Sequence, residues 1–381
     1  MRNRISIILG LIVLAGLLLV AGCGPKPVAE QSLLDTPDNH YRLGLRELEA
    51  QRPDRAAEEF NRASALDPDY PGGYAGMGLV LAGKKEYKEA LKLADKALDK
   101  DKKFIDGYVI KGRILTMEKR GDNWLKDAVK VFDKGLKLAP GHEGLRFYKG
   151  IAYKENFSFG KAAKQFRKVI EGKGELAGRA NGQWELMQKI QRAAPGTRIG
   201  MKIALMPQID RSDMAVLFIE ELKLLDVLKQ RQPMKYDARF KTPDQAAQGQ
   251  RVQSIPGDAA SHWAKNWILN ILDTGVMENF PDGGFHPDDN VTRANYAGFL
   301  QNILIVVTGD DALATKYIGS ESRFPDVNAT HFAYNAICLS VDRGIMKADT
   351  MTGAFLMRET ISGADALLII RELQNALRMT F

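Results

Sequence analysis

The sequence predicts an all-helical protein, in which a solenoid of helical hairpins is followed by a region of repeated helix–loop–helix units. Three observations support this fold class. Small and aromatic residues return with a period near 34 in the first half of the chain, as in arrays of helical hairpins. A helix–loop–helix pattern in residues 261–307 returns in residues 324–381, and apolar residues recur at helical spacing in both regions.

The N-terminus has the pattern of a targeting segment. Arg2 and Arg4 precede an apolar run over residues 5–20, and small residues lead to Cys23. The end of this run resembles a bacterial lipobox, which implies that residues 1–22 are a signal peptide and that Cys23 is acylated. An uncleaved anchor is the alternative, because the run is nearly long enough to span a bilayer. Residues 23–36 are expected to form a flexible tether.

The charge distribution argues against a nucleic-acid partner. The formal net charge of +7 is concentrated in one internal segment: residues 81–193 carry +12, whereas residues 24–80 carry −4 and residues beyond 193 carry −3. In that segment the basic residues alternate with acidic ones at helical spacing, as on a solvated face, and an acidic partner is the other interpretation. Cys338 lies in an apolar run and is expected to pack as a small hydrophobe.

Residues 37–176 form the periodic region. Small residues at positions 8, 20 and 27 of most units would let two helices approach closely, and the aromatic at position 24 would fill the gap to the next unit. The pattern resembles four tetratricopeptide repeats (TPR), carried by the following residues: Gly44, Ala56, Phe60, Ala63, Pro68, Tyr74, Gly78, Ala90, Ala94, Ala97, Tyr108, Gly112, Ala128, Phe132, Gly135, Pro140, Gly150, Tyr153, Ala162, Phe166 and Val169.

The resemblance to TPR proteins implies a concave groove that holds a segment of a partner protein. The first helix of each unit would line this groove, and a solvated surface is the alternative for any single residue. The basic character of the later units favours an acidic peptide. The candidate partner-binding residues are Arg42, Tyr74, Lys111, Arg113, Arg146 and Lys149.

Residues 261–300 contain the clearest helix–loop–helix unit. An apolar stripe that includes Trp263 and Trp267 predicts the first helix, and a Gly- and Pro-rich loop follows. Thr292 is expected to cap the second helix, with Asn295 placed as in a capping box.

This unit resembles an S-layer homology (SLH) repeat in its His262-Trp263-Ala264 and Thr292-Arg293-Ala294-Asn295 motifs. The resemblance implies a pseudo-threefold trimer of units over residues 177–381. The copies would be residues 255–307, residues 324–381 and a degenerate first copy over about residues 177–225. Residues 183–193 are expected either to cover the last hairpin or to open this first copy.

The same resemblance implies that the arginine of the second motif binds an anionic cell-wall polymer or peptidoglycan. A cation in the first turn of a helix is disfavoured by the helix dipole, which makes an anion at this position favourable. The candidate glycan-binding residues are Arg211, Arg293, Trp263, Asp282 and Gly284, and Trp263 is expected to be core rather than platform. A salt bridge to a carboxylate is the alternative for each arginine. Gly363 replaces the third arginine, so one groove is expected to be inactive.

No catalytic motif is present, and no residues are predicted to bind a metal or a cofactor. The sequence predicts a non-enzymatic lipoprotein that is anchored in the outer membrane, faces the periplasm, and binds the cell wall and a protein partner. The alternative is an assembly or pilot lipoprotein for a secretin, pilus or export complex, with a vestigial SLH region.

Overall fold

The computed structural model describes residues 27–231 and 255–379 of the chain. The predicted signal peptide and Cys23, predicted to be acylated, lie outside these residues. The chain divides into two compact units, Met1–Asn181 and Gly182–Phe381, and each is described by itself. No helix among the described residues has both the length and the apolar character needed to cross a bilayer.

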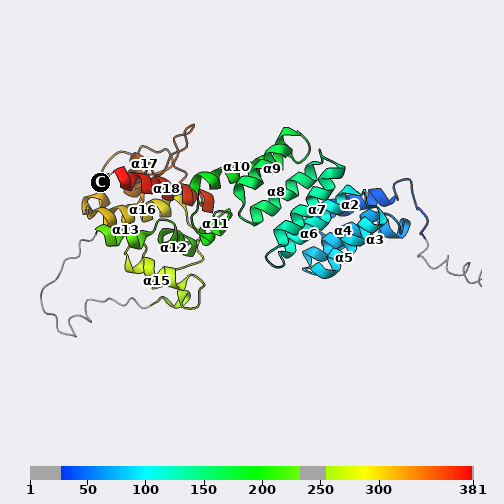
Figure 1. Ribbon diagram of the computed structural model, residues 1–381. Helices are drawn as coiled ribbons and strands as arrows, with labels where there is room; N and C mark the ends of the chain where they lie inside the picture. Colours follow the sequence, from blue (N-terminus) through cyan, green and yellow to red (C-terminus); the bar gives the residue numbers. More distant parts are fainter. Residues whose placement is uncertain (1–26, 232–254, 380–381) are drawn as a thin grey trace, which may run out of the picture. The chain divides into compact units, whose positions relative to one another are not determined.

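The first unit is an array of four helical hairpins, in agreement with the sequence prediction (Figure 1). The first helix of each hairpin packs against the second, and neighbouring hairpins stack in chain order. The four-residue insertion in the third repeat lengthens the loop between its two helices. The helices are α2 (Pro37–Glu49), α3 (Pro53–Leu66), α4 (Pro71–Gly83), α5 (Tyr87–Lys100), α6 (Ile105–Glu118), α7 (Trp124–Leu138), α8 (Glu143–Glu155) and α9 (Phe159–Glu171).

Phenylalanine rings pack directly on glycines of the first helices. A Cβ atom on Gly44 would lie 2.4 Å from the ring of Phe60, and a Cβ atom on Gly112 would lie 2.4 Å from the ring of Phe132. Phe166 faces Gly150 in the same way. These three rings are fully buried. The pairing of a small residue at position 8 with an aromatic at position 24 therefore fixes the spacing of three of the four hairpins.

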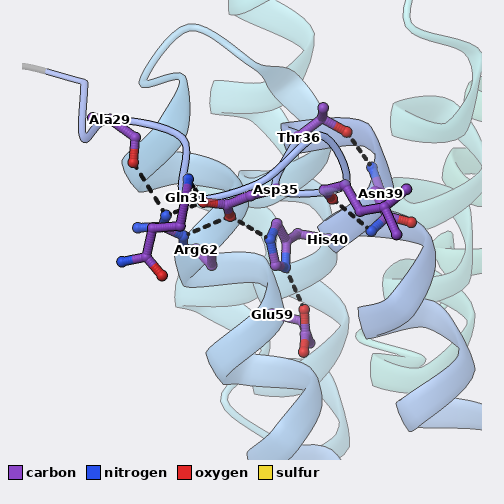
Figure 2. A network of polar contacts seen from close by, with 9 residues as sticks. Ala29, Gln31, Asp35, Thr36, Asn39, His40, Glu59 and Arg62 are labelled. Atoms are coloured by element: carbon purple, nitrogen blue, oxygen red, sulfur yellow. Dashed lines mark hydrogen bonds and ion pairs between the residues drawn. The ribbon is translucent and has the colours of Figure 1, made fainter.

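The segment that precedes α2 lies against the first hairpin, which differs from the flexible tether expected for residues 23–36. Figure 2 shows that Asp35 accepts hydrogen bonds from Arg62 on α3 and from the backbone N–H of Gln31, at 2.7 Å for the latter. His40 bridges Asp35 and Glu59, with ring nitrogens 2.8 and 2.5 Å from their carboxylate oxygens. The Asp35 carboxylate is buried, and arginine and backbone donors hold the pKa of Asp35 below its usual range. The ordered contacts therefore begin upstream of the first repeat.

The second unit contains helices of uneven length joined by extended loops (Figure 1). Its elements after the end of α10 (Ala177–Ala193) are α11 (Arg198–Ile203), α12 (Arg211–Glu220), α13 (Leu224–Arg231), η1 (Gly257–Ala259), α15 (Lys265–Asp273), α16 (Arg293–Thr308), η2 (Asp311–Ala314), α17 (Tyr334–Asp342) and α18 (Gly363–Met379). α16 begins with the predicted capping box between Thr292 and Asn295. Cys338 is fully buried in α17, as expected.

Three backbone segments close a ring at the centre of this unit. The N–H of Val291 donates to the carbonyl of Ile209 (2.9 Å), the N–H of Ile361 donates to Val291 (3.1 Å), and the N–H of Ile209 donates to Ile361 (3.0 Å). These residues are buried, and each directly precedes the N-cap of α12, α16 or α18. The three helices thus start from one cyclic set of hydrogen bonds, as expected for a pseudo-threefold trimer.

α10 crosses the division between the two units, and residues 183–193 lie in the second unit. Arg179, in the first unit, lies 5.1 Å from the ring centroid of Phe147. In the second unit, Lys189 pairs with Asp365 at 2.8 Å, and Arg371 donates to the carbonyl of Ala193 at 2.8 Å. The division between the units falls inside this helix.

Candidate functional site

Arg211 projects from the first turn of α12 into the loop of the next copy. Its Nε donates to the carbonyl of Phe285 at 2.8 Å, and its Nη2 donates to the carbonyl of Glu278 at 2.9 Å. The guanidinium lies 4.6 Å from the ring centroid of Phe280. Arg211 is only 8% exposed, and burial lowers its pKa to about 10, so the side chain remains charged at neutral pH. It therefore holds a loop rather than standing open to a ligand.

Arg293 repeats this geometry one copy later. Its Nε donates to the carbonyl of Phe355 at 2.8 Å, and its Nη2 donates to the carbonyl of Lys347 at 2.7 Å. The guanidinium lies 4.7 Å from the ring centroid of Phe355. Arg293 is half-buried, and burial lowers its pKa. Among the described residues, the hydrogen-bond partners of both arginines are backbone carbonyls, which replaces the carboxylate salt bridge considered from the sequence.

Two aspartates hold the other side of the same loops. Asp258 accepts the N–H groups of Phe285 and His286 at 3.1 and 2.7 Å. Asp326 accepts the N–H groups of Phe355 and Leu356, both at 2.7 Å. In each loop the carboxylate of the same copy therefore binds N–H groups, and the arginine of the preceding copy binds carbonyl groups.

This clamp fixes an unusual backbone conformation at one repeated position. His286 and Leu356 have φ angles of 54° and 59°, in the left-handed region that side chains other than glycine rarely adopt. Both residues donate their N–H groups to the aspartate of their copy. The aspartates hold the strained turns in place, and the sequence analysis did not select them as site residues. The available signal was a proline shortly before each aspartate, Pro256 before Asp258 and Pro325 before Asp326.

The third copy lacks the arginine for a steric reason. A Cβ atom on Gly363 would lie 1.7 Å from the backbone oxygen of Ile203 at the end of α11. The N–H of Gly363 donates to the carbonyl of Met206 at 3.0 Å. The backbone of the degenerate first copy therefore occupies the position that a clamped side chain takes in the other two interfaces.

Trp263 is 54% exposed and precedes α15, so the expectation that it packs in the core is wrong. Phe332 occupies the equivalent position of the next copy and is 84% exposed. The preceding histidines, His262 and His331, each accept the N–H of the residue two positions later at 3.2 Å. Two aromatic side chains thus project from repeated turns, and the sequence analysis selected only the first.

Asp282 and Gly284 lie in the loop that Arg211 clamps. Asp282 accepts the N–H of Gly284 at 2.9 Å and pairs with His286 at 2.7 Å. The Asp282 pairing raises the pKa of His286, with help from Asp289, and the N–H of Gly284 together with His286 lowers the pKa of Asp282. A cleft of about 240 Å³ borders the same loop, and its lining includes Arg211, Phe280 and Pro281 but neither Trp263 nor Arg293. The structure therefore distributes the five candidates over more than one surface.

The array contains a larger cavity, of about 500 Å³. It is lined by the first helices of all four hairpins and by the segment that follows α9, as expected for the concave face of a helical-repeat array. The lining residues are Tyr41, Leu45, Leu48, Glu49, Leu79, Asp106, Val109, Ile110, Arg113, His142, Glu143, Gly144, Tyr148, Glu175, Leu176 and Arg179.

Of the six candidate partner-binding residues, Arg113 lines this cavity, with its guanidinium 4.3 Å from the ring centroid of Tyr148. Tyr74 and Arg146 donate to the carbonyls of Pro68 and Pro140, six residues earlier in each case. These two side chains hold the turns before their helices.

The other three candidates are paired with carboxylates. Lys111 pairs with Asp95, and Lys149 pairs with Asp133. Both pairs join the first helix of a hairpin to the second helix of the preceding hairpin. Arg42 pairs with Asp38 at 3.0 Å on an exposed face of α2. None of the three lines the cavity.

The charge of the cavity differs from the expectation that the groove would favour an acidic peptide. The lining contains four carboxylates, Glu49, Asp106, Glu143 and Glu175, against the guanidinium groups of Arg113 and Arg179. The surplus positive charge of residues 81–193 therefore lies elsewhere on the array, and the lining lacks the positive charge on which the acidic-peptide expectation was based.

These features define a helical-repeat scaffold followed by a region of helical units in which arginines clamp two loops. Residues 257–297 match the S-layer homology domain family. A segment of 77 residues is 30% identical to cell surface glycoprotein 1 of Acetivibrio thermocellus and spans 20% of this chain but 3% of that protein. The chain thus carries a segment that matches the S-layer homology domain after its array of helical hairpins.

Among solved structures, the chain is similar to TTC0263, a thermophilic TPR protein of Thermus thermophilus, with a TM-score of 0.37 and 17% identity over 50% of this chain and 94% of that one. It is also similar to MamA of Desulfovibrio magneticus, with a TM-score of 0.28 and 18% identity over 41% and 96% of the two chains. The support for the architecture of the array is the packing of the hairpins within this chain.

Proposed function

We propose that this chain is a non-enzymatic lipoprotein of the cell envelope. In this proposal Cys23 carries the lipid that anchors it to the outer membrane, facing the periplasm. The SLH region binds an anionic cell-wall polymer or peptidoglycan, and the array binds a protein partner, so that the chain connects the membrane to the wall. The match of residues 257–297 to the S-layer homology domain carries the proposal.

The contacts of the SLH region suggest separate roles for the five glycan-binding candidates. Arg211 acts as a positioning residue, because it fixes the loop that presents Asp282 and Gly284. Trp263 is exposed and offers a flat apolar face, the kind of surface that aromatic side chains contribute to binding sites. Arg293 is half-buried and keeps part of its guanidinium accessible beside the third copy.

Co-sedimentation with purified cell-wall sacculi tests the proposal. The chain from Gly24 onward is expected to pellet with the sacculi, and Trp263→Ala is expected to weaken binding roughly tenfold, as for an aromatic that contributes strongly to an interface. Met351→Ala is the control, because Met351 is an exposed apolar side chain in a loop. Variants of Arg211 are unsuitable as the first test, since losing the clamp would disturb the fold. If the folded wild type stays in the supernatant, the wall-binding proposal fails.

The burial of Arg211 favours a second candidate function. An arginine bound by carbonyls, together with a third interface closed by the α11 backbone, suits an SLH region that has only a structural role. The chain would then be an assembly or pilot lipoprotein for a secretin, pilus or export complex, acting through its array. This function predicts that the chain does not pellet with sacculi and that the array still binds its protein partner.

A further inference from the structure

The array cavity combines an apolar wall with a charged end. Its apolar wall comes from Leu45 and Leu48 on α2, Leu79 on α4, and Val109 and Ile110 on α6. Such side chains release water when they are covered by the apolar part of a ligand. A volume of about 500 Å³ is large enough for several side chains of a bound segment.

The carboxylates of the cavity keep acceptor capacity for a ligand. Asp106 accepts the hydroxyl of Tyr41 at 3.0 Å, and Glu143 accepts the N–H of Leu176 at 3.1 Å. A carboxylate offers about four lone-pair sites, so one hydrogen bond leaves room for others. Glu49 and Glu175 are exposed at the rim.

The two guanidinium groups of the lining lie over aromatic rings. Arg113 lies over Tyr148 at 4.3 Å, and Arg179 lies over Phe147 at 5.1 Å. Arg179 is also 3.9 Å from Glu49, a distant and exposed pairing. Two guanidinium groups face four carboxylates in the lining, and His142 lies 3.9 Å from Asp106, so the lining keeps a net negative charge.

Two tyrosines of the first unit have raised pKa values, and nearby carboxylates contribute to both shifts. Burial and the nearby Asp106 carboxylate raise the pKa of Tyr41 well above its ordinary value. Burial and the carboxylates of Asp38 and Asp106 also raise the pKa of Tyr70 above its ordinary value. A negative local potential favours a cationic ligand and disfavours an anionic one.

We infer that the cavity of the array binds a cationic, amphipathic segment of a partner protein, with apolar side chains on the leucine wall and Lys or Arg side chains beside the four carboxylates. The inference rests on the proposed role of the array as a protein-binding scaffold and specifies the chemistry of its partner. It reverses the charge that the net composition of residues 81–193 suggests.

Fluorescence anisotropy with three labelled peptides tests the inference. The probes share one short pattern of leucines at helical spacing, and their polar positions are all Lys, all Gln or all Glu. The chain from Gly24 onward is expected to bind the Lys peptide with at least roughly tenfold lower Kd than the Glu peptide at low salt, and the difference should shrink as salt screens the charges.

Paired variants locate the site. Glu49→Gln/Glu175→Gln removes two rim carboxylates and is expected to weaken binding of the Lys peptide by roughly five- to tenfold. Glu58→Gln/Glu86→Gln makes the same charge change at exposed residues outside the cavity and is expected to leave the Kd within about twofold.

The possible outcomes distinguish failure of the inference from failure of the proposed protein-binding role of the array. Equal binding of the Lys and Gln peptides, or tighter binding of the Glu peptide, overturns the cationic assignment and leaves the cavity as a peptide site. Equal losses in the two paired variants overturn the location. If none of the three peptides binds, the proposed protein-binding role of the array fails together with the inference.

Discussion

Arg211 illustrates how a single side chain can stabilise a fold from an unfavourable position. A cation in the first turn of a helix is opposed by the helix dipole at a cost of about 0.3–1 kcal/mol. Hydrogen bonds to a charged group contribute roughly 1.5–3 kcal/mol each, and Arg211 makes two to carbonyl groups of the next copy. The sequence suggested an external anion as the compensating partner, whereas the chain supplies carbonyl oxygens of its own.

Gly363 is expected to be the least replaceable glycine of the second unit. Gly363→Ala would place a methyl group 1.7 Å from the backbone oxygen of Ile203, so the chain must move, and we expect a loss of more than about 2 kcal/mol in unfolding free energy. Urea unfolding followed by circular dichroism measures it. Gly298→Ala in α16 is the control, because its Cβ atom would meet no neighbour within 4 Å and should stabilise the helix by up to about 1 kcal/mol. A change below about 0.5 kcal/mol for Gly363→Ala would contradict the steric argument.

The stability of the protein is expected to depend on pH through Asp213, which lies in the first turn of α12. Burial and the neighbouring Asp210 raise the pKa of Asp213 to about 6 from 3.8, so the folded state holds a proton that the unfolded state has released. The unfolding free energy should therefore fall as pH rises between about 4 and 6. Asp213→Asn copies the Asn295 of the next capping box and should be more stable than wild type by roughly 1–2 kcal/mol at pH 7 and equal to it near pH 4.

A matched substitution in the third copy serves as the control for Asp213. Asp365 pairs with Lys189 at 2.8 Å, so Asp365→Asn removes an attraction and should not stabilise the protein. Thermal melts from pH 4 to 7 compare the two variants. A stability difference between Asp213→Asn and wild type that does not vary with pH would rule out titration of Asp213 as its cause.

The sequence predicted backbone features at single residues better than side-chain directions. The capping box of Thr292 and Asn295 and the buried Cys338 follow from local spacing, which depends on near neighbours in the chain. The burial of Arg211 depends on a loop more than 60 residues away in the chain. The exposure of Trp263 depends on the point at which α15 begins. One sequence cannot place these distant groups.

Among the elements, the N-terminal segment is the clearest departure from expectation. Pro25 and Pro27 and the scarcity of apolar groups predicted a flexible tether, but the N–H of Val28 donates to the carbonyl of Ala65 at 2.8 Å, and Asp35 binds Arg62. Composition describes what a segment can bury, whereas this segment is held by polar contacts with a helix about 30 residues away. Lipid attachment at Cys23, if it occurs as proposed, would place the membrane only a few residues from the ordered array.

Removing the arginine of this network should release the segment. Arg62→Ala deletes the side-chain donors that bind Asp35 and the carbonyl of Ala29, as Figure 2 shows. Hydrogen exchange measured by mass spectrometry should then show roughly tenfold or greater loss of protection over residues 28–35, with the hairpin helices retained. Arg42→Ala breaks only an exposed pair with Asp38 and should change protection by less than about twofold. Unchanged protection in Arg62→Ala would show that other contacts dock the segment.

The helices of the array were predictable because their constraints recur. Gly44, Gly112 and Gly150 face phenylalanine rings from the same position of their units, so three imperfect copies reinforce one pattern. The first copy of the SLH region lacks this support, because α11 has only six residues and approaches Gly363 through its backbone. A contact that uses no side chain on one partner leaves no signature in the sequence of that partner.

For the chain as an assembly of two units, net charge proved a poor guide to the candidate binding surface. Residues 81–193 carry +12, yet the cavity that they help to line has four carboxylates against two guanidinium groups. Helical periodicity separates the faces of each helix, so a segment can be basic in sum and acidic on its concave side. The fold class could be predicted from spacing alone, whereas the sign of the groove required the positions of the side chains.

The ring of backbone hydrogen bonds among Ile209, Val291 and Ile361 makes the three SLH copies interdependent. A stack of hairpins can lose or gain a terminal member and keep its remaining contacts, because each member touches only its neighbours. A closed ring has no terminal member, and the loss of any copy would leave a donor and an acceptor unpaired in the interior. The first copy can therefore lose recognisable motif residues while its backbone remains necessary to close the ring.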